Sequence, residues 1–200
     1  MACGTVSSNV MEPLAERNPG LPLFGVIDAA CDRAAALAKT GRIAVAATEA
    51  TVRSGAFERA LRARCPEAAL FSKPCQSLVS MAEQGHFSAD DPLARAAVET
   101  ELAAVKARRP EVLLLACTHF PLFREAIAAY MGPATALLSV GEETACALAA
   151  ALKDKDALAD RTESTRRWFT SGPTDDFERL GAIFLGHSIT AEQHINQEIP

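Results

Sequence analysis

The sequence predicts an α/β fold built on parallel sheets, with a ligand site in the crevice at the carboxyl ends of the strands. Short apolar runs alternate with segments rich in helix formers along the whole chain. The clearest of these runs are continuously apolar, which is typical of strands that are buried on both faces. Hydrophobic residues make up 49% of the 200 residues, which is enough to bury a core in one domain or two small ones.

The first half of the chain supplies four helices and three strands in this scheme. A helix is expected before the breaker Asn18-Pro19-Gly20, with Val10, Leu14 and Ala15 facing inward. The elements that follow are a strand at 23–27, a helix at 29–38, a buried strand at 43–47, a loop at 48–54, a helix at 57–64, a strand at 68–72 and a short helix at 78–83.

The second half continues the alternation after a polar connection at 85–92. Its clearest element is the apolar run 112–116, a buried strand that leads directly into Cys117-Thr118-His119. Around it we expect a helix at 93–108, a helix at 122–131, a strand at 136–140, a helix at 144–152, a charged surface connection at 153–166, a strand at 167–170 and a helix at 175–184.

Charge and hydropathy exclude several classes of protein. Twenty Lys and Arg face twenty-five Asp and Glu, for a net charge of −5 without a basic block, so nucleic acid is not an expected partner. No window approaches the ~18 consecutive apolar residues of a membrane span, and the N-terminus lacks a signal-peptide pattern. We expect a cytoplasmic protein without membrane contact.

The six cysteines are scattered without CxxC pairs, which favours free thiols over disulfides or a metal site. A free cysteine usually serves as a small buried hydrophobic residue, and we give this role to four of the six. Cys117 differs because it follows a buried strand beside hydroxyl and imidazole groups, which stabilise a thiolate. The four cysteines with the structural role are Cys31, Cys65, Cys75 and Cys146.

Two segments resemble the two cysteine signatures of the glutamate racemases. These are Ala-Cys-Gly-Thr-Val-Ser-Ser at 2–8 and Leu-Leu-Ala-Cys-Thr-His-Phe-Pro-Leu at 114–122. Residues 48–54 are similar to the threonine loop of that family, residues 75–85 to a segment that carries an acidic residue, and residues 168–172 to its closing strand. The resemblance extends over nearly the whole chain.

The resemblance implies cofactor-independent interconversion of L- and D-glutamate, which supplies D-glutamate for peptidoglycan. It implies two similar α/β lobes that face each other across a cleft, with Cys3 in one and Cys117 in the other. Inversion of Cα without a cofactor needs a base on one face of the substrate and a protonated acid on the other. Two thiols suit this task because the ordinary cysteine pKa is about 8.5.

By the same resemblance, His119 and Glu83 support Cys117 in proton transfer, and the threonines and one glycine bind the substrate. No cofactor or metal is expected, and a homodimer is the expectation from the family. The three other histidines, His86, His187 and His194, are given no role. The substrate-binding residues are Gly4, Thr5, Thr48, Thr51 and Thr118.

Family members carry an Asp-Ser-Gly motif and a Pro-Tyr-Gly loop before the first cysteine signature, whereas this chain starts at that signature. We therefore expect a truncated form or a mis-assigned start, with an incomplete first lobe. That lobe is assigned to residues 1–22 and 136–200, and the second lobe to residues 23–135. Gly4 stands where many members have asparagine, and residues 139–141 where many have Asp-Ser-Gly.

Two other functions stay open. One is racemisation of aspartate or a hydantoin by a related two-cysteine enzyme. The other is a noncatalytic racemase-like protein that binds an acidic ligand. Cys117-Thr118-His119 and the residues after it favour glutamate, because they resemble that subgroup more closely.

Overall fold

The computed structural model describes residues 1–159 and 164–194, which form parts of two compact units, Met1–Ala157 and Leu158–Pro200. Of the connection predicted at 153–166, residues 160–163 lie outside the described residues. The two units are described separately.

The first unit is built on a four-stranded parallel sheet with the strand order β2-β1-β3-β4. Parallel pairing puts the carboxyl ends of all four strands at the same edge of the sheet, so the predicted α/β class with a parallel sheet is confirmed. The strand β4 continues the sheet past residue 135, where we expected a lobe boundary. The strands are β1 (Arg42–Ala47), β2 (Ala69–Pro74), β3 (Val112–Leu115) and β4 (Ala136–Ser139).

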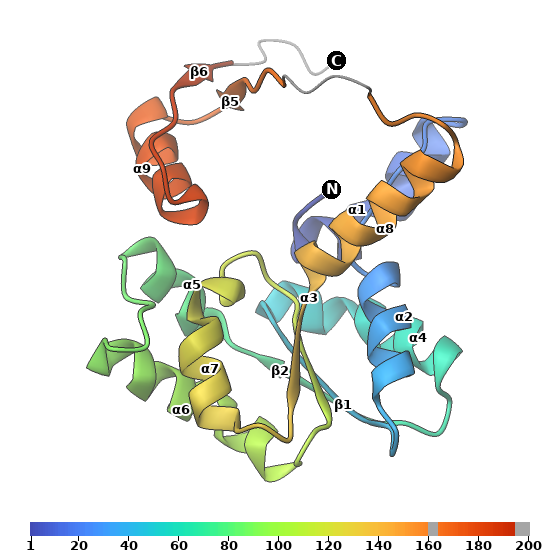
Figure 1. Cartoon of the computed structure of the whole chain (residues 1–200), viewed down its shortest axis with the longest axis vertical. Helices are drawn as coiled ribbons and strands as arrows, with labels where there is room; N and C mark the ends of the chain where they lie inside the picture. Colours follow the sequence, from blue (N-terminus) through green and yellow to red (C-terminus); the bar gives the residue numbers. More distant parts are fainter. Residues whose placement is uncertain (160–163, 195–200) are drawn as a thin grey trace. The chain divides into compact units, whose positions relative to one another are not determined.

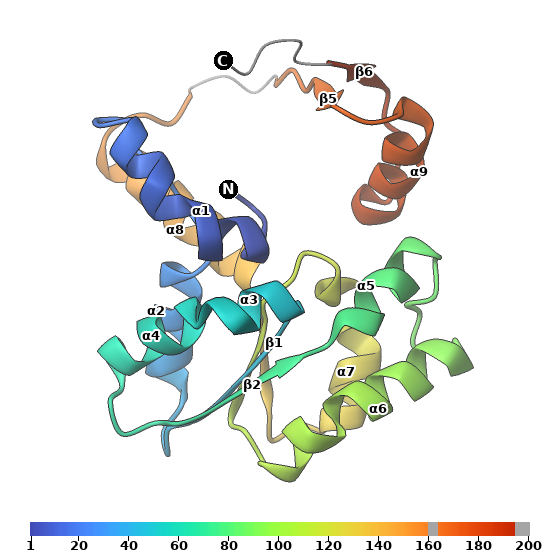
Figure 2. The same ribbon diagram turned by 180° about the vertical axis from the view of Figure 1, so that it is seen from behind.

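Helices cover both faces of this sheet, as Figures 1 and 2 show. Side chains of a strand point alternately to its two faces, and β1 follows this rule with both faces buried. Ala44 and Ala46 join one apolar cluster, whereas Ile43, Val45 and Ala47 join the other. The helices on the first cluster are α5 (Gln76–Glu83), α6 (Pro92–Ala107) and α7 (Arg124–Met131), and those on the second are α2 (Asp28–Leu37) and α4 (Ala56–Arg64).

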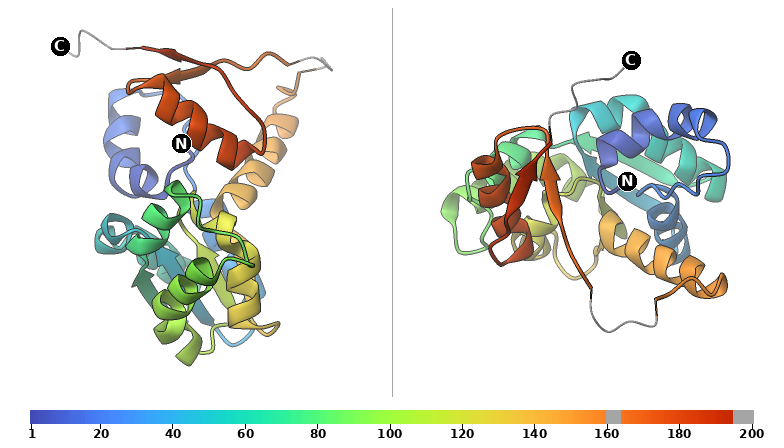
Figure 3. Two further views of the ribbon diagram at one scale, coloured as in Figure 1. Left: turned by 90° about the vertical axis from the view of Figure 1, so that its left-hand side faces the viewer. Right: turned by 90° about the horizontal axis from the view of Figure 1, so that it is seen from above.

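Two further helices lie beyond the carboxyl edge of the sheet. They are α1 (Gly4–Arg17) and α8 (Val140–Asp154), which overlap in Figure 1 but are separate in the view from above in Figure 3. Two short helices lie at the same edge, α3 (Glu49–Ser54) after β1 and the 3₁₀ turn η1 (Phe120–Phe123) after β3.

Three expectations from the sequence are wrong. Residues 23–27 form no strand; instead the N–H of Val26 donates to the Ser7 hydroxyl, which gives this backbone a partner outside any sheet. Residues 48–54 are not a loop, because the Thr48 side chain accepts a hydrogen bond from the Thr51 N–H and thereby caps α3. Val10 and Ala15 face outward on α1, and Val10 is 42% exposed, since the inner side of that helix carries small residues.

The second unit contains β5 (Trp168–Thr170), α9 (Thr174–Leu185) and β6 (Ala191–Gln193). β5 and β6 pair in parallel, and Arg167 forms an ion pair with Glu192 at 2.9 Å. The strand at 167–170 and the helix at 175–184 are confirmed. The strand β6 was not predicted, because Ala-Glu-Gln has no apolar run or β-branched residue.

Candidate active site

The carboxyl edge of the first unit's sheet brings together the residues that the sequence singled out. Thr48 follows β1, Cys75 follows β2, and Cys117 follows β3 after a single alanine. Ser139 closes β4, and its hydroxyl accepts a hydrogen bond from the Glu142 N–H. The edge of a parallel sheet is where ligands bind in α/β proteins, so the location agrees with the chemistry expected there.

Cys117 lies at the centre of this edge and is 6% exposed. Its Sγ lies 3.6 Å from Nδ1 of His119, and Nε2 of His119 lies 3.3 Å from Oε1 of Glu83 at the end of α5. The other ring nitrogen thus faces a carboxylate, an arrangement that orients an imidazole and selects its tautomer. Thr118 Oγ1 lies 3.5 Å from the same Nδ1.

Opposing effects act on the charge of the Cys117 thiol. Burial raises its pKa above the ordinary value, and the negative charge of Cys3 raises it further. The backbone N–H groups of His119 and Phe120 and the hydroxyl of Thr118 act in the opposite direction, because they donate to the thiolate. Sequence reasoning missed Phe120, although a strand followed at once by a turn with Pro121 signals N–H groups that point back at the strand's end.

Cys75 and Cys31 show what burial does without such donors. Both are fully buried in the apolar clusters, and burial raises the pKa of each thiol to about 12. Their placement agrees with the buried role that the sequence predicted for them. The same prediction is wrong for Cys146, which is exposed on α8, and Cys65 is only half-buried.

Cys3 is half-buried and directly precedes the first residue of α1. The Ser7 N–H donates to the Cys3 carbonyl oxygen at 2.9 Å, and the Ser7 hydroxyl donates to the Met1 carbonyl oxygen at 3.3 Å. The amino terminus donates to the carbonyl oxygen of Phe24. The backbone on both sides of Cys3 is therefore held, and the electrostatic interaction between the two thiols raises the pKa of Cys117.

Three threonine hydroxyls form a closed cluster beside the first turn of α1. Thr5 Oγ1 lies 2.8 Å from Thr48 Oγ1 and 3.2 Å from Thr51 Oγ1, and the latter two are 2.9 Å apart. Each hydroxyl has one proton, so in this cluster the donors are used on one another. A carboxylate that binds here must draw at least one of these protons to itself, which strengthens the bond because the acceptor is charged.

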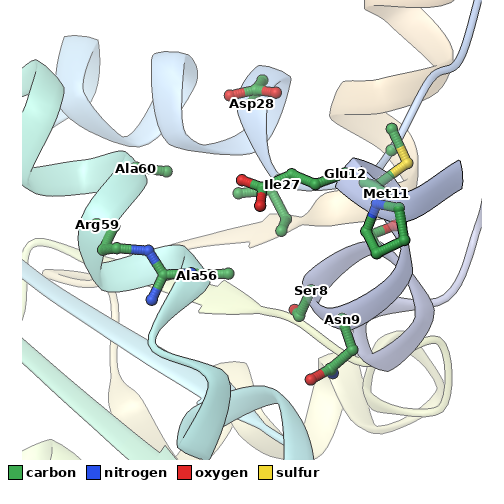
Figure 4. A pocket seen from close by; sticks show the side chains of 12 residues that line it. Ser8, Asn9, Met11, Glu12, Ile27, Asp28, Ala56, Arg59 and Ala60 are labelled. Carbon is green, nitrogen blue, oxygen red and sulfur yellow. The ribbon is translucent and has the colours of Figure 1, made fainter. Parts of the chain in front are cut away.

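A pocket with a volume of about 320 Å³ lies between α1 and α4. Figure 4 shows Ser8, Asn9 and Glu12 of α1 on one side of it and Arg59 of α4 on the other. None of the site residues predicted from the sequence lines this pocket. The candidate site is therefore defined by the side chains at the sheet edge and not by this hollow.

Two general features concern the whole described chain. In residues 1–159 and 164–194, no group of three or more His, Cys, Asp or Glu side chains is placed to hold a metal ion. Within the same residues, no helix has both the length and the apolar character needed to cross a membrane.

Comparisons with known proteins agree on one family. Residues 1–151 match the family described as Asp/Glu/Hydantoin racemase. The chain is 33% identical to a glutamate racemase of Geobacter metallireducens over 93% of its own length and 68% of the relative. Its structure is similar to that of a glutamate racemase from Bacillus anthracis, with a TM-score of 0.89 and 28% identity over 99% of this chain and 72% of that one.

A third comparison is with a glutamate racemase from Thermus thermophilus in complex with β-chloro-D-alanine. Here the TM-score is 0.83 and the identity 29%, over 98% of this chain and 72% of the other. The resemblance drawn from the two cysteine signatures is thus confirmed at the level of the family.

Proposed function

The chain belongs to the Asp/Glu/Hydantoin racemase family, and from this premise we propose that it interconverts L- and D-glutamate without a cofactor, using Cys3 and Cys117 as its two acid/base groups. The proposal is supported most directly by a line of contacts that runs from Cys117, just after β3, through His119 to Glu83 at the end of α5. The first signature, which carries Cys3, lies at the same sheet edge.

The proton balance of the reaction needs one thiolate and one thiol. One cysteine, as thiolate, takes the Cα proton and becomes a thiol, and the electron pair left on Cα is delocalised into the α-carboxylate. The other cysteine gives its proton to the opposite face of Cα and becomes a thiolate. The product is the other enantiomer, with the protonation states of the two cysteines exchanged, and proton exchange with solvent resets them.

His119 and Glu83 act on the Cys117 side of this reaction. The imidazole Nδ1 at 3.6 Å from Sγ is placed to take the thiol proton or return it, and Glu83 stabilises the imidazolium that forms. The N–H groups of His119 and Phe120 hold the thiolate in the meantime. These contacts offset the cost of a negative charge at a buried position.

Thr5, Thr48, Thr51 and Thr118 bind the substrate in this proposal, by donating hydrogen bonds to its carboxylates. Delocalisation of charge into the α-carboxylate strengthens such bonds in the transition state, so they assist the chemistry as well as binding. Gly4 lies between Cys3 and Thr5 at the same place.

We propose glutamate as the substrate, and not aspartate or a hydantoin, because the named relatives are glutamate racemases. The family description includes all three substrates. We extend the proposal to the supply of D-glutamate for peptidoglycan, in the cytoplasm, by a homodimer. A noncatalytic protein that binds an acidic ligand is the second candidate, since its site would use the same threonine cluster.

Exchange of the Cα proton in D₂O tests the proposal and separates these candidates. The 200-residue chain is incubated in D₂O with L-glutamate, D-glutamate, L-aspartate or a hydantoin, and loss of the Cα proton signal is followed by NMR. We expect exchange with both enantiomers of glutamate and much slower exchange with the others. Binding of glutamate without exchange would select the noncatalytic candidate, and faster exchange with aspartate or the hydantoin would reassign the substrate.

A further inference from the structure

We propose that Gly4 is a positioning residue, which sets how closely the first turn of α1 approaches the end of β3 and thereby the spacing of Cys3 from Cys117. The inference rests on the proposed two-thiol function and deepens it. It replaces the substrate-binding role that the resemblance implied for Gly4 with a role in the geometry of the site.

The observation behind it is a backbone contact that leaves no room for a side chain. Gly4 is buried, and a Cβ added to it would overlap the carbonyl oxygen of Ala116, the residue directly before Cys117. The same Cβ would lie 3.4 Å from the carbonyl carbon of Ala116 and 3.8 Å from Thr51 Oγ1. The obstacle is main chain, so it has no rotamer by which to move aside.

Ala116 is the less yielding of the two partners. It is fully buried, and its N–H donates to the carbonyl oxygen of Ala46 at 2.8 Å as a continuation of the central strands. Movement of Ala116 would disturb close packing on both faces of the sheet. The helix α1 is held near its first turn chiefly by side-chain hydrogen bonds, in which Ser7 accepts from the Val26 N–H and Thr5 contacts Thr48. These bonds yield more easily than the sheet, so α1 would be displaced instead of Ala116.

A displacement of α1 acts on two site groups together, because Cys3 and Thr5 flank Gly4. Thr5 would lose its short contacts to Thr48 and Thr51, at 2.8 Å and 3.2 Å. Cys3 would move away from Cys117. A glycine at this position therefore lets the first turn of α1 lie directly against the main chain of Ala116.

The test compares Gly4→Ala with a matched control, Gly141→Ala. Gly141 also lies in the first turn of a helix, but a Cβ added there meets only Ser139 Oγ, at an ordinary 3.8 Å. Alanine favours helix over glycine by about 1 kcal/mol, so neither variant loses helix propensity. Circular dichroism and thermal unfolding check that both variants keep their fold.

The first measurement is Cα exchange of glutamate. We expect kcat of Gly4→Ala to fall by about 100-fold, the loss typical of a 1 Å misplacement of a reacting group, with a much smaller change in KM. Gly141→Ala should keep both constants. A rise in KM with kcat retained would overturn the proposal and return Gly4 to substrate binding.

The second measurement is independent of turnover, so it remains informative if the chain does not racemise glutamate. Alkylation of Cys117 by iodoacetamide is followed against pH by peptide mass spectrometry. In Gly4→Ala the midpoint should move to lower pH, because both the Cys3 charge and part of the burial that raise the Cys117 pKa are removed. Cys3→Ser should move it in the same direction.

An unchanged midpoint in a folded Gly4→Ala protein would overturn the positioning role. If Gly4→Ala does not fold, Thr5→Val releases the first turn of α1 without adding a clash. It should give a smaller shift of the Cys117 midpoint to lower pH, and an unchanged midpoint there would equally count against the proposal.

Discussion

The two candidate acid/base thiols occupy very different surroundings. Cys117 is buried at the end of a central strand, and its Sγ lies 3.6 Å from Nδ1 of an imidazole. Two backbone N–H groups and a hydroxyl lower the pKa of its thiol. Cys3 is half-buried at the start of a helix, and the contacts around it hold its backbone, through Ser7 and the amino terminus. One thiol is tuned by what touches its sulfur, and the other is positioned by what touches its main chain.

In the proposed mechanism, this difference gives the two identical side chains different tasks. A buried thiol needs donors to carry a charge, whereas a thiol closer to water needs a fixed position more than it needs donors. Changes on the Cys117 side should therefore alter proton transfer, and changes around Cys3 should alter geometry.

The largest expected effect is the loss of either thiol. In Cys3→Ala and in Cys117→Ala, kcat/KM for glutamate should fall by about 10³-fold or more, because general acid/base groups contribute that much and both are needed. The two enantiomers have equal free energies, so the loss must be equal in both directions. Racemisation followed by circular dichroism measures it.

Cys146→Ala is the matched control, because Cys146 is exposed on α8. It should retain full activity. Undiminished Cα exchange in either Cys3→Ala or Cys117→Ala would contradict the two-base mechanism.

The next effect should fall on one side of the comparison. His119→Asn should lower kcat by about 100-fold and Glu83→Gln by less, since the carboxylate acts through the imidazole. Only the proton transfer at Cys117 becomes slower, so the primary isotope effect with α-deuterated glutamate should rise for one enantiomer and not for the other.

His86→Asn provides the control for this experiment, because His86 pairs with Asp91 away from the two thiols. Equal isotope effects for both enantiomers in His119→Asn would show that the imidazole does not belong specifically to Cys117.

A smaller effect is expected in the threonine cluster. Thr48→Val should raise KM by about 10-fold, because a hydrogen bond to a charged group is worth about 1.5 kcal/mol or more. Thr48→Ser should restore KM, since serine keeps both the hydroxyl and the cap of α3. Thr100→Val on α6 is the control and should leave KM unchanged. An equal rise of KM in Thr100→Val would contradict substrate binding by the threonine cluster.

The effect furthest from the reaction concerns thiols that are buried without donors. Burial raises the pKa of Cys31 and of Cys75 from the ordinary value of a cysteine thiol to about 12 in the folded protein. Above pH 9 the unfolded chain releases these protons while the folded protein keeps them, so stability is lost as pH rises. The slope should reach about 1.4 kcal/mol per pH unit for each thiol.

Urea unfolding between about pH 8 and pH 11 measures this slope. Cys31→Ala and Cys75→Ala should each make it shallower, whatever the cavity costs in absolute stability. If neither substitution changed the dependence of the free energy of unfolding on pH, burial would not be the cause of a raised pKa for these thiols.

Much of the fold was predictable because the strands carry their own signal. The run at 112–116 is continuously apolar, and it forms the central strand β3 with both faces buried. Prediction of secondary structure failed in two kinds of segment. In one, the hydrogen-bond partner lies far away in the sequence; in the other, a helix cap outweighs the low helix propensity of the residues. Residues 23–27 have strand-like side chains but bind Ser7, and the β-branched residues of 48–54 form a helix because Thr48 caps it.

Which candidate site residues lie close together was only partly predictable from the sequence. Cys117, Thr118 and His119 are adjacent in the sequence, so their proximity was evident. Other contacts depend on which helices pack at the carboxyl edge of the sheet. Examples are the ion pair of Glu83 with His119 and the contacts of Thr5 with Thr48 and Thr51.

The sequence by itself determined the α/β class, the main strands, the two cysteine signatures and the family, because periodicity and short motifs act over a few residues. Only the tertiary structure decided that Gly4 lies against Ala116, that Cys3 acts on Cys117, and that the two thiols have unequal surroundings. The physical reason is that burial, charge and close packing are set between segments far apart in the chain. No local pattern of residues records them.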